Sequence, residues 1–284
     1  MNAPNQTRER VIWLNGEFFP ESRARISPLD RGLLFGDGLF ETILAREGKP
    51  LYLDCHLKRL HESARYLKIP WDRGLDWKNI LERLLHENRL ETGLARGKIL
   101  LTRGCAPGLG LPHADTPTRM VLAENYLPPS QGAYAHGWDL FIPPRTFAPP
   151  LAAHKSLNYL YYMFTKQQAI DNGAHEALII DKDGMVAETC AGTLLAFDSD
   201  GWFTPASEWQ LPGTAFQQVE RLLRIEGYIV RRRPVTVQSL KSARWVWAAN
   251  SLMGIMPVRS IDGEPIASLN NNLAASLRNR LLLG

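Results

Sequence analysis

The stretch AAHKSLNYLYYMFTKQQAIDNG, residues 152–173, places a single lysine ahead of a run of apolar and aromatic side chains. Lys155 has no acidic residue close to it in the sequence, so no local ion pair explains its position. Two interpretations are open. The stem of the lysine can lie along an aromatic surface while its ammonium stays in water. Alternatively, burial among apolar groups can favour a neutral lysine amine, which is able to attack a carbonyl.

The segment EALIIDKDGMVAETCAGTLLAF, residues 176–197, predicts a β-hairpin, because two short apolar runs flank a turn signal at Lys182 to Gly184. Glu188 lies on the second run, 33 residues after Lys155. A lysine that reacts with carbonyls most often serves pyridoxal phosphate, whose ring withdraws electrons only while its nitrogen is protonated. A carboxylate facing that nitrogen would keep the proton in place. Glu188 suits this role, although an exposed strand residue fits the pattern equally well.

A site for an anion is indicated at LPGT, residues 211–214. Pro212 and Gly213 precede a predicted helix whose first residues are Thr214 and Ala215. The free N–H groups at such a helix end, together with the positive end of the helix dipole, favour a bound phosphate. The alternative is an ordinary helix N-cap formed by Thr214.

Two further residues could contribute to the same site. Arg59 lies on a predicted helix and could form charge-assisted hydrogen bonds with a phosphate, or could belong to a solvated helix face. Ser251 follows a strand that is predicted to be buried, and its hydroxyl could act as a donor.

The order of these segments resembles the fold-type IV, or class IV, family of pyridoxal phosphate enzymes. That family includes branched-chain aminotransferases, D-amino acid aminotransferases and 4-amino-4-deoxychorismate lyase. The resemblance extends from about Val11 to Asp262 and is carried by five motifs in order: DRGLLFGDGLFETI (30–43), HLKRL (56–60), KSLNYL (155–160), the segment 176–197 with Glu188, and LPGT (211–214).

The resemblance implies an α+β, two-domain fold of the D-amino acid aminotransferase-like type, with the active site at the domain interface. It implies that Lys155 holds pyridoxal 5'-phosphate and acts as the general base, and that Glu188 faces the ring nitrogen. The remaining cofactor-binding residues are then Arg59, Thr214, Ala215 and Ser251. Members of the family are usually homodimers, so we expect a homodimer here.

Two departures from the family pattern concern the phosphate site. Thr193 stands where the family usually has asparagine. In the turn, the usual Ile-Thr-Arg is replaced by Thr214, Ala215 and Phe216, so the family's hydroxyl contact is lost or moved by one residue. The backbone amides of Thr214 and Ala215 can still bind a phosphate, because they do not depend on side chains.

The motifs also bear on the choice of reaction. D-amino acid aminotransferases hold the substrate carboxylate with an arginine and a histidine, and this chain has Gly108 and Gly110 there. The segment NSLMGIMPV, residues 250–258, is most similar to aminodeoxychorismate lyase, although Leu109 replaces an arginine common in the lyases. We expect a lyase that forms 4-aminobenzoate and pyruvate for folate synthesis from a small anionic amine substrate. The alternatives are an aminotransferase acting between a D- or branched-chain amino acid and a 2-oxo acid, and a non-enzymatic module with the same fold.

The pocket and the domains can be predicted in outline. Phe40 and Thr42 share a strand face opposite Glu41, where they either line the substrate pocket or have a structural role.

With 284 residues the chain suits two packed domains. We expect a smaller N-terminal α/β domain at residues 1–125, a linker rich in Pro, Gly and Ser at 126–137, and a larger cofactor-binding domain at 138–284.

Composition argues against several other classes of protein. A net charge of +4 with one basic cluster, RRRP at 231–234, gives little support to nucleic-acid binding. The polar first residues do not resemble a signal peptide, and no apolar run approaches the ~20 residues of a membrane span. Three scattered cysteines suit a reducing cytoplasm. No metal site is expected, because His56 and His61 are five residues apart on a helix face that is predicted to be solvated.

Overall fold

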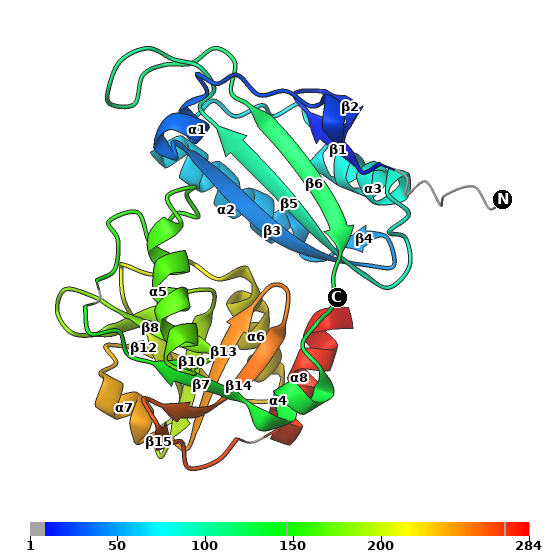
Figure 1. Ribbon diagram of the computed structural model, residues 1–284. Coiled ribbons are helices and arrows are strands. Elements are labelled where there is room, and N and C mark those ends of the chain that lie inside the picture. The colour runs from blue at the N-terminus through cyan, green and yellow to red at the C-terminus, as the bar shows by residue number, and fades with distance from the viewer. Residues whose placement is uncertain (1–8, 146, 270, 284) are drawn as a thin grey trace. The chain divides into compact units, whose positions relative to one another are not determined.

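The computed structural model describes residues 9–145, 147–269 and 271–283. The polar residues 1–8 considered above lie outside the described part. The chain divides into two compact units, Met1–Leu127 and Pro128–Gly284 (Figure 1). Within the described residues, none of the helices combines the length and the apolar character that a membrane span requires.

The first unit is built on a six-stranded antiparallel sheet with the strand order β2-β1-β6-β5-β3-β4. Its strands are β1 (Val11–Leu14), β2 (Glu17–Pro20), β3 (Gly38–Arg46), β4 (Lys49–Pro50), β5 (Leu94–Thr102) and β6 (Arg119–Asn125). Its helices are the short η1 (Glu21–Arg23) and α1 (Arg31–Phe35), and the longer α2 (Leu53–Tyr66) and α3 (Trp77–Glu87).

Helices α2 and α3 cover one face of this sheet (Figure 1). Buried and half-buried residues alternate along β5, so Ile99 and Leu101 face the helices while Lys98 and Leu100 belong to the other face. Gly97 marks the closeness of this packing, since a Cβ there would lie 2.9 Å from the Leu81 side chain of α3. The helix-covered face is therefore the core of the unit.

The second unit contains a nine-stranded mixed sheet with the order β12-β11-β10-β13-β14-β7-β8-β9, and β15 pairs with β14. Its strands are β7 (Trp138–Phe141), β8 (Glu176–Ile180), β9 (Val186–Thr189), β10 (Thr193–Asp198), β11 (Gly201–Pro205), β12 (Val230–Arg233), β13 (Trp245–Asn250), β14 (Gly254–Ile261) and β15 (Glu264–Pro265). Its helices are α4 (Gln131–His136), α5 (Leu160–Asp171), α6 (Thr214–Ile225), α7 (Val237–Lys241) and α8 (Asn271–Leu283).

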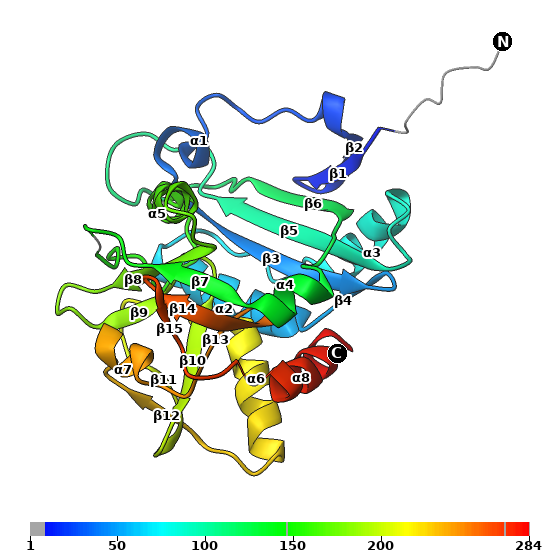
Figure 2. The same cartoon turned by 60° about the horizontal axis from the view of Figure 1, so that its bottom comes forward.

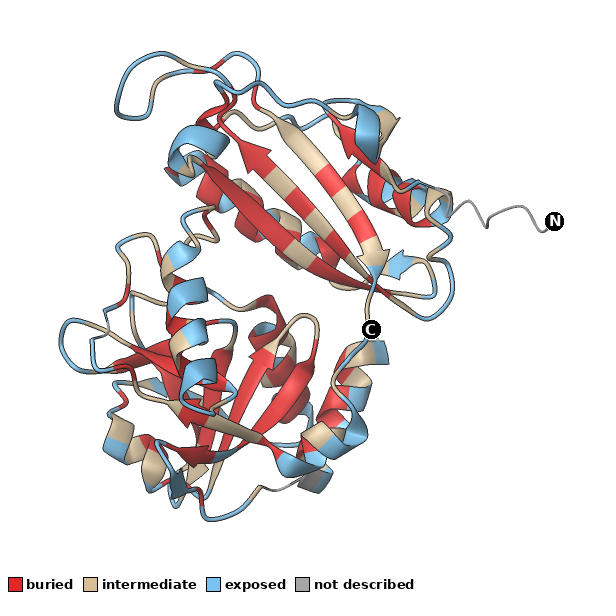
Figure 3. Cartoon of the chain, viewed as in Figure 1, coloured by how far each residue is buried: buried red, intermediate tan, exposed pale blue. Residues whose placement is uncertain are grey.

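The core of this unit lies along its central strands, which are coloured as buried in Figure 3. Leu194, Phe203 and Met256 are buried together in this core. Helices α6 and α8 lie side by side (Figure 2). Strand β14 is buried along nearly its whole length between β13 and β7. Such a strand lacks the alternation that marks a half-exposed strand, and the sequence-based prediction did not identify it.

The predicted hairpin is confirmed, because β8 and β9 are antiparallel strands joined by the turn that contains Gly184. The helix expected after LPGT is confirmed as α6. Two further expectations from the sequence were wrong. The apolar run PLYL (50–53) is typical of a strand, but β4 ends at Pro50 and α2 begins at Leu53. The apolar run after Lys155 predicts a helix that includes the lysine, but α5 begins five residues later at Leu160. Within the expected linker 126–137, residues Gln131–His136 form α4.

Candidate functional site

Lys155 lies in the loop before α5, and its side chain is half-buried. Its Nζ is 5.1 Å from the centre of the Tyr159 ring, in the geometry of a cation–π contact. The aromatic segment that follows the lysine thus supplies its immediate surroundings.

Two tyrosines of this segment connect the loop to β9. The rings of Tyr159 and Tyr162 stack with their centres 4.9 Å apart. The Tyr159 hydroxyl donates to the backbone carbonyl of Cys190 at 2.7 Å, and the Tyr162 hydroxyl donates to Oε1 of Glu188 at 3.3 Å. Lys155 and Glu188 are therefore linked through one pair of stacked rings.

Glu188 is a buried carboxylate with only 5% of its surface exposed. Besides the Tyr162 hydroxyl, it accepts a hydrogen bond at Oε2 from the backbone N–H of Leu211 at 3.1 Å. A buried carboxylate requires such donors, because burial removes its hydration. The interpretation of Glu188 as an exposed strand residue was wrong, and the bond to Leu211 ties β9 to the turn before α6.

The N-terminus of α6 is not capped by a side chain. The N-cap residue is Gly213, which forms no side-chain cap. The Thr214 hydroxyl lies 2.9 Å from the Ser251 hydroxyl, so ordinary N-capping by Thr214 was the wrong alternative. Thr214 and Ala215 are both buried. A Cβ at Gly213 would lie 2.3 Å from Oγ1 of Thr193, so this position needs glycine for the close approach of β10.

The turn between β13 and β14 is held by Asn250. Its Oδ1 accepts hydrogen bonds from the N–H groups of Leu252 (3.0 Å) and Met253 (2.9 Å). Its Nδ2 donates to the carbonyl of Ala191 at 3.1 Å. The segment 250–253 is therefore fixed beside the loop that follows Glu188, and Ser251 is directed to the start of α6.

In the first unit, Arg59 is buried and forms two hydrogen bonds with Glu41, Nε to Oε1 at 2.7 Å and Nη2 to Oε2 at 2.6 Å. Nδ1 of His56 lies 2.7 Å from Oε2 of the same carboxylate. Burial by itself would raise the pKa of Glu41, but the Arg59 guanidinium and the contact with His56 lower it to about 2.

This cluster was missed by the sequence-based prediction. A solvated face was the wrong interpretation for both Arg59 and His56, since α2 presents them to the covered side of β3. The sequence did contain a signal for this cluster, because Glu41 is a charged residue among the apolar residues of β3 and needs a buried partner. No group of three or more His, Cys, Asp or Glu in the described residues is placed to hold a metal ion.

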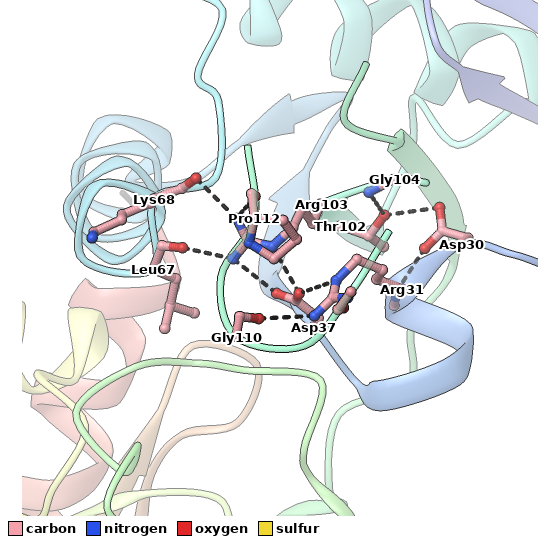
Figure 4. Close-up of polar contacts among 12 residues, drawn as sticks. Asp30, Arg31, Asp37, Leu67, Lys68, Thr102, Arg103, Gly104, Gly110 and Pro112 are labelled. Atoms are coloured by element: carbon pink, nitrogen blue, oxygen red, sulfur yellow. Dashed lines mark hydrogen bonds and ion pairs between the residues drawn. The ribbon is translucent and has the colours of Figure 1, made fainter. Parts of the chain in front are cut away.

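The DRG and GD motifs of residues 30–38 form a second polar network (Figure 4). Asp37 accepts hydrogen bonds from Arg31 (2.8 Å) and from the fully buried Arg103 (2.7 Å). Burial would raise the pKa of Asp37, and the two guanidinium groups outweigh it, so the pKa lies below its usual value.

Arg31 also fixes the glycine-rich loop that follows β5. Its Nη1 donates to the carbonyl of Gly108 (2.6 Å) and its Nη2 donates to that of Gly110 (3.0 Å). The loop is thus held by its backbone, and Leu109 between the two glycines is 91% exposed. Arg31 therefore stabilises the loop. Its guanidinium is occupied by these bonds and does not replace the arginine and histidine with which D-amino acid aminotransferases hold the substrate carboxylate.

The sheet face opposite Glu41 carries Phe40, Thr42 and Lys98, as the strand alternation predicts. Thr42 pairs with Lys98 in register, and Nζ of Lys98 lies 4.9 Å from the centre of the Phe40 ring. Burial, together with the neighbouring Arg96, lowers the pKa of Lys98. In the described part of the chain no carboxylate lies within ion-pair distance of this ammonium, and the nearby Glu124, which is bonded to Arg96, offsets the lowering only in part.

Comparison with known proteins gives the family. A family model described as "Amino-transferase class IV" matches residues 38–261. The chain belongs to the class IV aminotransferase family. It is 32% identical to a putative branched-chain-amino-acid aminotransferase of Methanocaldococcus jannaschii, with 95% of this chain and 93% of the relative covered. It is 26% identical to an aminodeoxychorismate lyase of Bacillus subtilis, with 94% and 92% covered.

The fold agrees with this class IV membership. A solved branched-chain amino acid aminotransferase with pyridoxamine 5'-phosphate is similar at a TM-score of 0.83 and 27% identity, with 98% of this chain and 94% of that chain covered. The branched-chain amino acid aminotransferase of Escherichia coli has a TM-score of 0.85 at 23% identity, with 96% and 93% covered, and supports the fold alone. The protein is therefore an enzyme of the class IV family with the α+β, two-sheet fold of the fold-type IV enzymes. This confirms the fold class that the resemblance of the motifs implied.

Proposed function

We propose that this protein is a pyridoxal phosphate-dependent lyase that converts aminodeoxychorismate into 4-aminobenzoate and pyruvate. The cofactor part of the proposal is supported by one arrangement in the second unit: the half-buried Lys155, the buried carboxylate of Glu188 and the helix end at Thr214 are connected by hydrogen bonds and ring contacts. An amine, a carboxylate and a helix N-terminus without a side-chain cap are the groups that this cofactor requires.

Each residue would have a definite task. Lys155 would hold the cofactor covalently and, once displaced by the substrate amine, would accept a proton at Nζ. Glu188 would keep a proton on the ring nitrogen. The backbone amides of Thr214 and Ala215, the hydroxyls of Thr214 and Ser251, and the guanidinium of Arg59 would bind the phosphate. The bound cofactor would withdraw electrons from the substrate carbon next to the nitrogen.

The choice of a lyase rests on where the first unit carries positive charge. The loop of Gly108 to Gly110 offers no cation for the carboxylate of a simple amino acid, and Arg31 is bonded to its backbone. Lys98 is a half-buried cation without an ion pair among the described residues, beside an aromatic ring and a threonine. We propose that Lys98 binds a carboxylate of a ring-shaped substrate, with Phe40 and Thr42 lining the same surface.

The Lys98 assignment is tested with Lys98→Met, which keeps the stem and removes the charge. We expect the KM for aminodeoxychorismate to rise by about 10- to 100-fold, the cost of a lost charge-assisted hydrogen bond. Lys78→Met is the matched control, because Lys78 is an exposed lysine of α3 near Glu82. An unchanged KM in Lys98→Met would remove Lys98 from the substrate site.

The second candidate is a class IV aminotransferase acting between a D- or branched-chain amino acid and a 2-oxo acid. It is favoured by the branched-chain relative and by the solved branched-chain structure with pyridoxamine 5'-phosphate. Single-turnover assays, and multiple-turnover assays with an added 2-oxo acid, that compare aminodeoxychorismate with a panel of L- and D-amino acids separate the two. The lyase proposal fails if aminodeoxychorismate is left untouched in both while amino acids are converted to keto acids over many turnovers in the second.

We further propose that the two compact units act as the smaller and the larger, cofactor-binding domain of a cytoplasmic homodimer. The family membership and the separate core of each unit support this assignment. The substrate would be a small anionic amine, with neither a nucleic acid nor a membrane as a partner.

A further inference from the structure

Tyr162 is a buried tyrosine of α5 whose hydroxyl faces the carboxylate of Glu188. Only 8% of its surface is exposed, and the hydroxyl lies 3.3 Å from Oε1. Buried tyrosine hydroxyls usually find a hydrogen-bond partner, and here that partner is a carboxylate. Burial and the charge of Glu188 raise the pKa of Tyr162, so its hydroxyl keeps its proton and remains a donor.

The Tyr162 ring is held on two sides. Tyr159 stacks on it at 4.9 Å, and Tyr161 meets it edge-on at 5.6 Å. These contacts restrict the ring and therefore fix the direction in which its hydroxyl points.

The carboxylate of Glu188 receives donors on both oxygens from different segments. Tyr162 of α5 donates to Oε1, and the backbone N–H of Leu211 donates to Oε2. Two donors on opposite oxygens fix the plane of a carboxylate and favour its charged form.

We propose that Tyr162 is a positioning residue for Glu188, holding its carboxylate ionised and oriented for the ring nitrogen of pyridoxal phosphate. This inference rests on the proposed function, since it assigns a purpose to Glu188 that the bound cofactor completes. The Lys155 ammonium lies over the ring of Tyr159, and this ring stacks on Tyr162. The same pair of tyrosines therefore contacts both Lys155 and Glu188.

The test is Tyr162→Phe, which removes the hydroxyl and keeps the ring in its stack. We expect kcat of the holoenzyme to fall about tenfold with little change in KM, the lower end of the effect of one hydrogen bond to a charged group. The dissociation constant of pyridoxal phosphate, measured on the apoprotein, should rise by a similar factor. The visible absorption of the bound cofactor should also change, and the melting temperature of the apoprotein should stay near the wild-type value.

The double variant Tyr162→Phe with Glu188→Gln decides whether Tyr162 acts through Glu188. If it does, the double variant loses no more activity and cofactor affinity than Glu188→Gln alone, because contacting residues are not additive. Multiplying losses would overturn the inference. If Glu188→Gln by itself changes neither the spectrum nor kcat, the proposed function and this inference both fall.

Tyr161→Phe is the matched control on the same helix. The Tyr161 hydroxyl accepts a hydrogen bond from the backbone N–H of Phe147 at 3.0 Å. We expect its holoenzyme spectrum and cofactor affinity to match the wild type. Equal effects of Tyr161→Phe and Tyr162→Phe would show that a general loss of helix packing is responsible, and would overturn the inference.

Discussion

Lys155 and Glu188 are 33 residues apart in the sequence, and the stacked rings of Tyr159 and Tyr162 join them in the folded unit. The lysine lies on the loop before α5 and the glutamate lies on β9, so different elements position the two side chains. The role of each side chain can therefore be tested by substituting it alone.

Lys155→Ala should abolish turnover, because both covalent attachment of the cofactor and proton transfer need the amine. Borohydride reduction of the holoenzyme followed by peptide mapping should place the cofactor on Lys155. Lys182→Ala is a suitable control, since Lys182 is an exposed lysine paired with Asp183 in the hairpin turn. A label on any lysine other than Lys155 would refute the assignment.

At saturating cofactor, Glu188→Gln should leave pyridoxal phosphate bound while lowering kcat by on the order of 10² or more, the scale for a positioned electrostatic group. The amide keeps the size of the side chain and loses the charge that would hold the ring proton. Steady-state kinetics alongside a cofactor titration separates the two effects. Turnover at the wild-type rate would mean that Glu188 does not face the ring.

At the scale of elements, buried contacts between neighbouring strands and helices set the positions of the polar groups. Glu41 joins β3 to α2 through Arg59 and His56. Gly213 allows α6 to start against Thr193 of β10. Each contact predicts a measurable effect on stability or on cofactor binding.

Glu41→Gln should destabilise the protein by about 3 kcal/mol at pH 7, because it leaves the buried Arg59 without its carboxylate partner. The pKa of Glu41 is depressed to about 2 from 4.5, so its contribution is fully present above the unfolded value and is lost as the pH falls from about 4.5 towards 2. Urea unfolding at several pH values should show the difference between variant and wild type shrinking in that window. A difference that stays constant down to about pH 2.5 would contradict this account.

Gly213→Ala should weaken pyridoxal phosphate binding by roughly 5- to 150-fold, because the new Cβ would overlap Oγ1 of Thr193 and force the start of α6 to move, at a cost of about 1–3 kcal/mol. Adding Thr193→Ala should restore much of the affinity, since the nearest remaining atoms are 3.4 Å away. Gly132→Ala serves as the control, with no side-chain or backbone atom closer than 3.7 Å. Failure of the double variant to recover would point to a role for Gly213 other than close packing.

At the scale of the whole molecule, the matched family region, residues 38–261, extends through both compact units. Each unit has its own sheet and its own buried core. The motifs of the family are therefore distributed over two separately packed bodies.

The proposed homodimer has a direct test. Light scattering after size exclusion should give about twice the chain mass of 32.0 kDa, at every concentration at which the enzyme is active. A monomer that keeps full activity on dilution would rule out the dimer as the functional form.

Much of the fold was accessible from the sequence because its signals are local. The hairpin of Glu188 and the helix after LPGT follow from turn residues and apolar spacing within short windows. The order of the motifs contributed separately, as a resemblance to a known family. Strand β14 was not predicted because burial on both faces removes the alternation of apolar and polar residues. The start of α5 was predicted too early because a run of apolar and aromatic residues does not mark where a helix begins.

By itself the sequence determined the α+β fold class and the family, and it singled out Lys155, Glu188 and Thr214 as candidate site residues. Only the tertiary structure decided which groups those residues meet: Tyr162 and Leu211 at Glu188, Ser251 at Thr214, and Glu41 at Arg59. Partners of this kind are far apart along the chain and are selected by burial, because a polar group withdrawn from water must find a donor or acceptor wherever the packing supplies one.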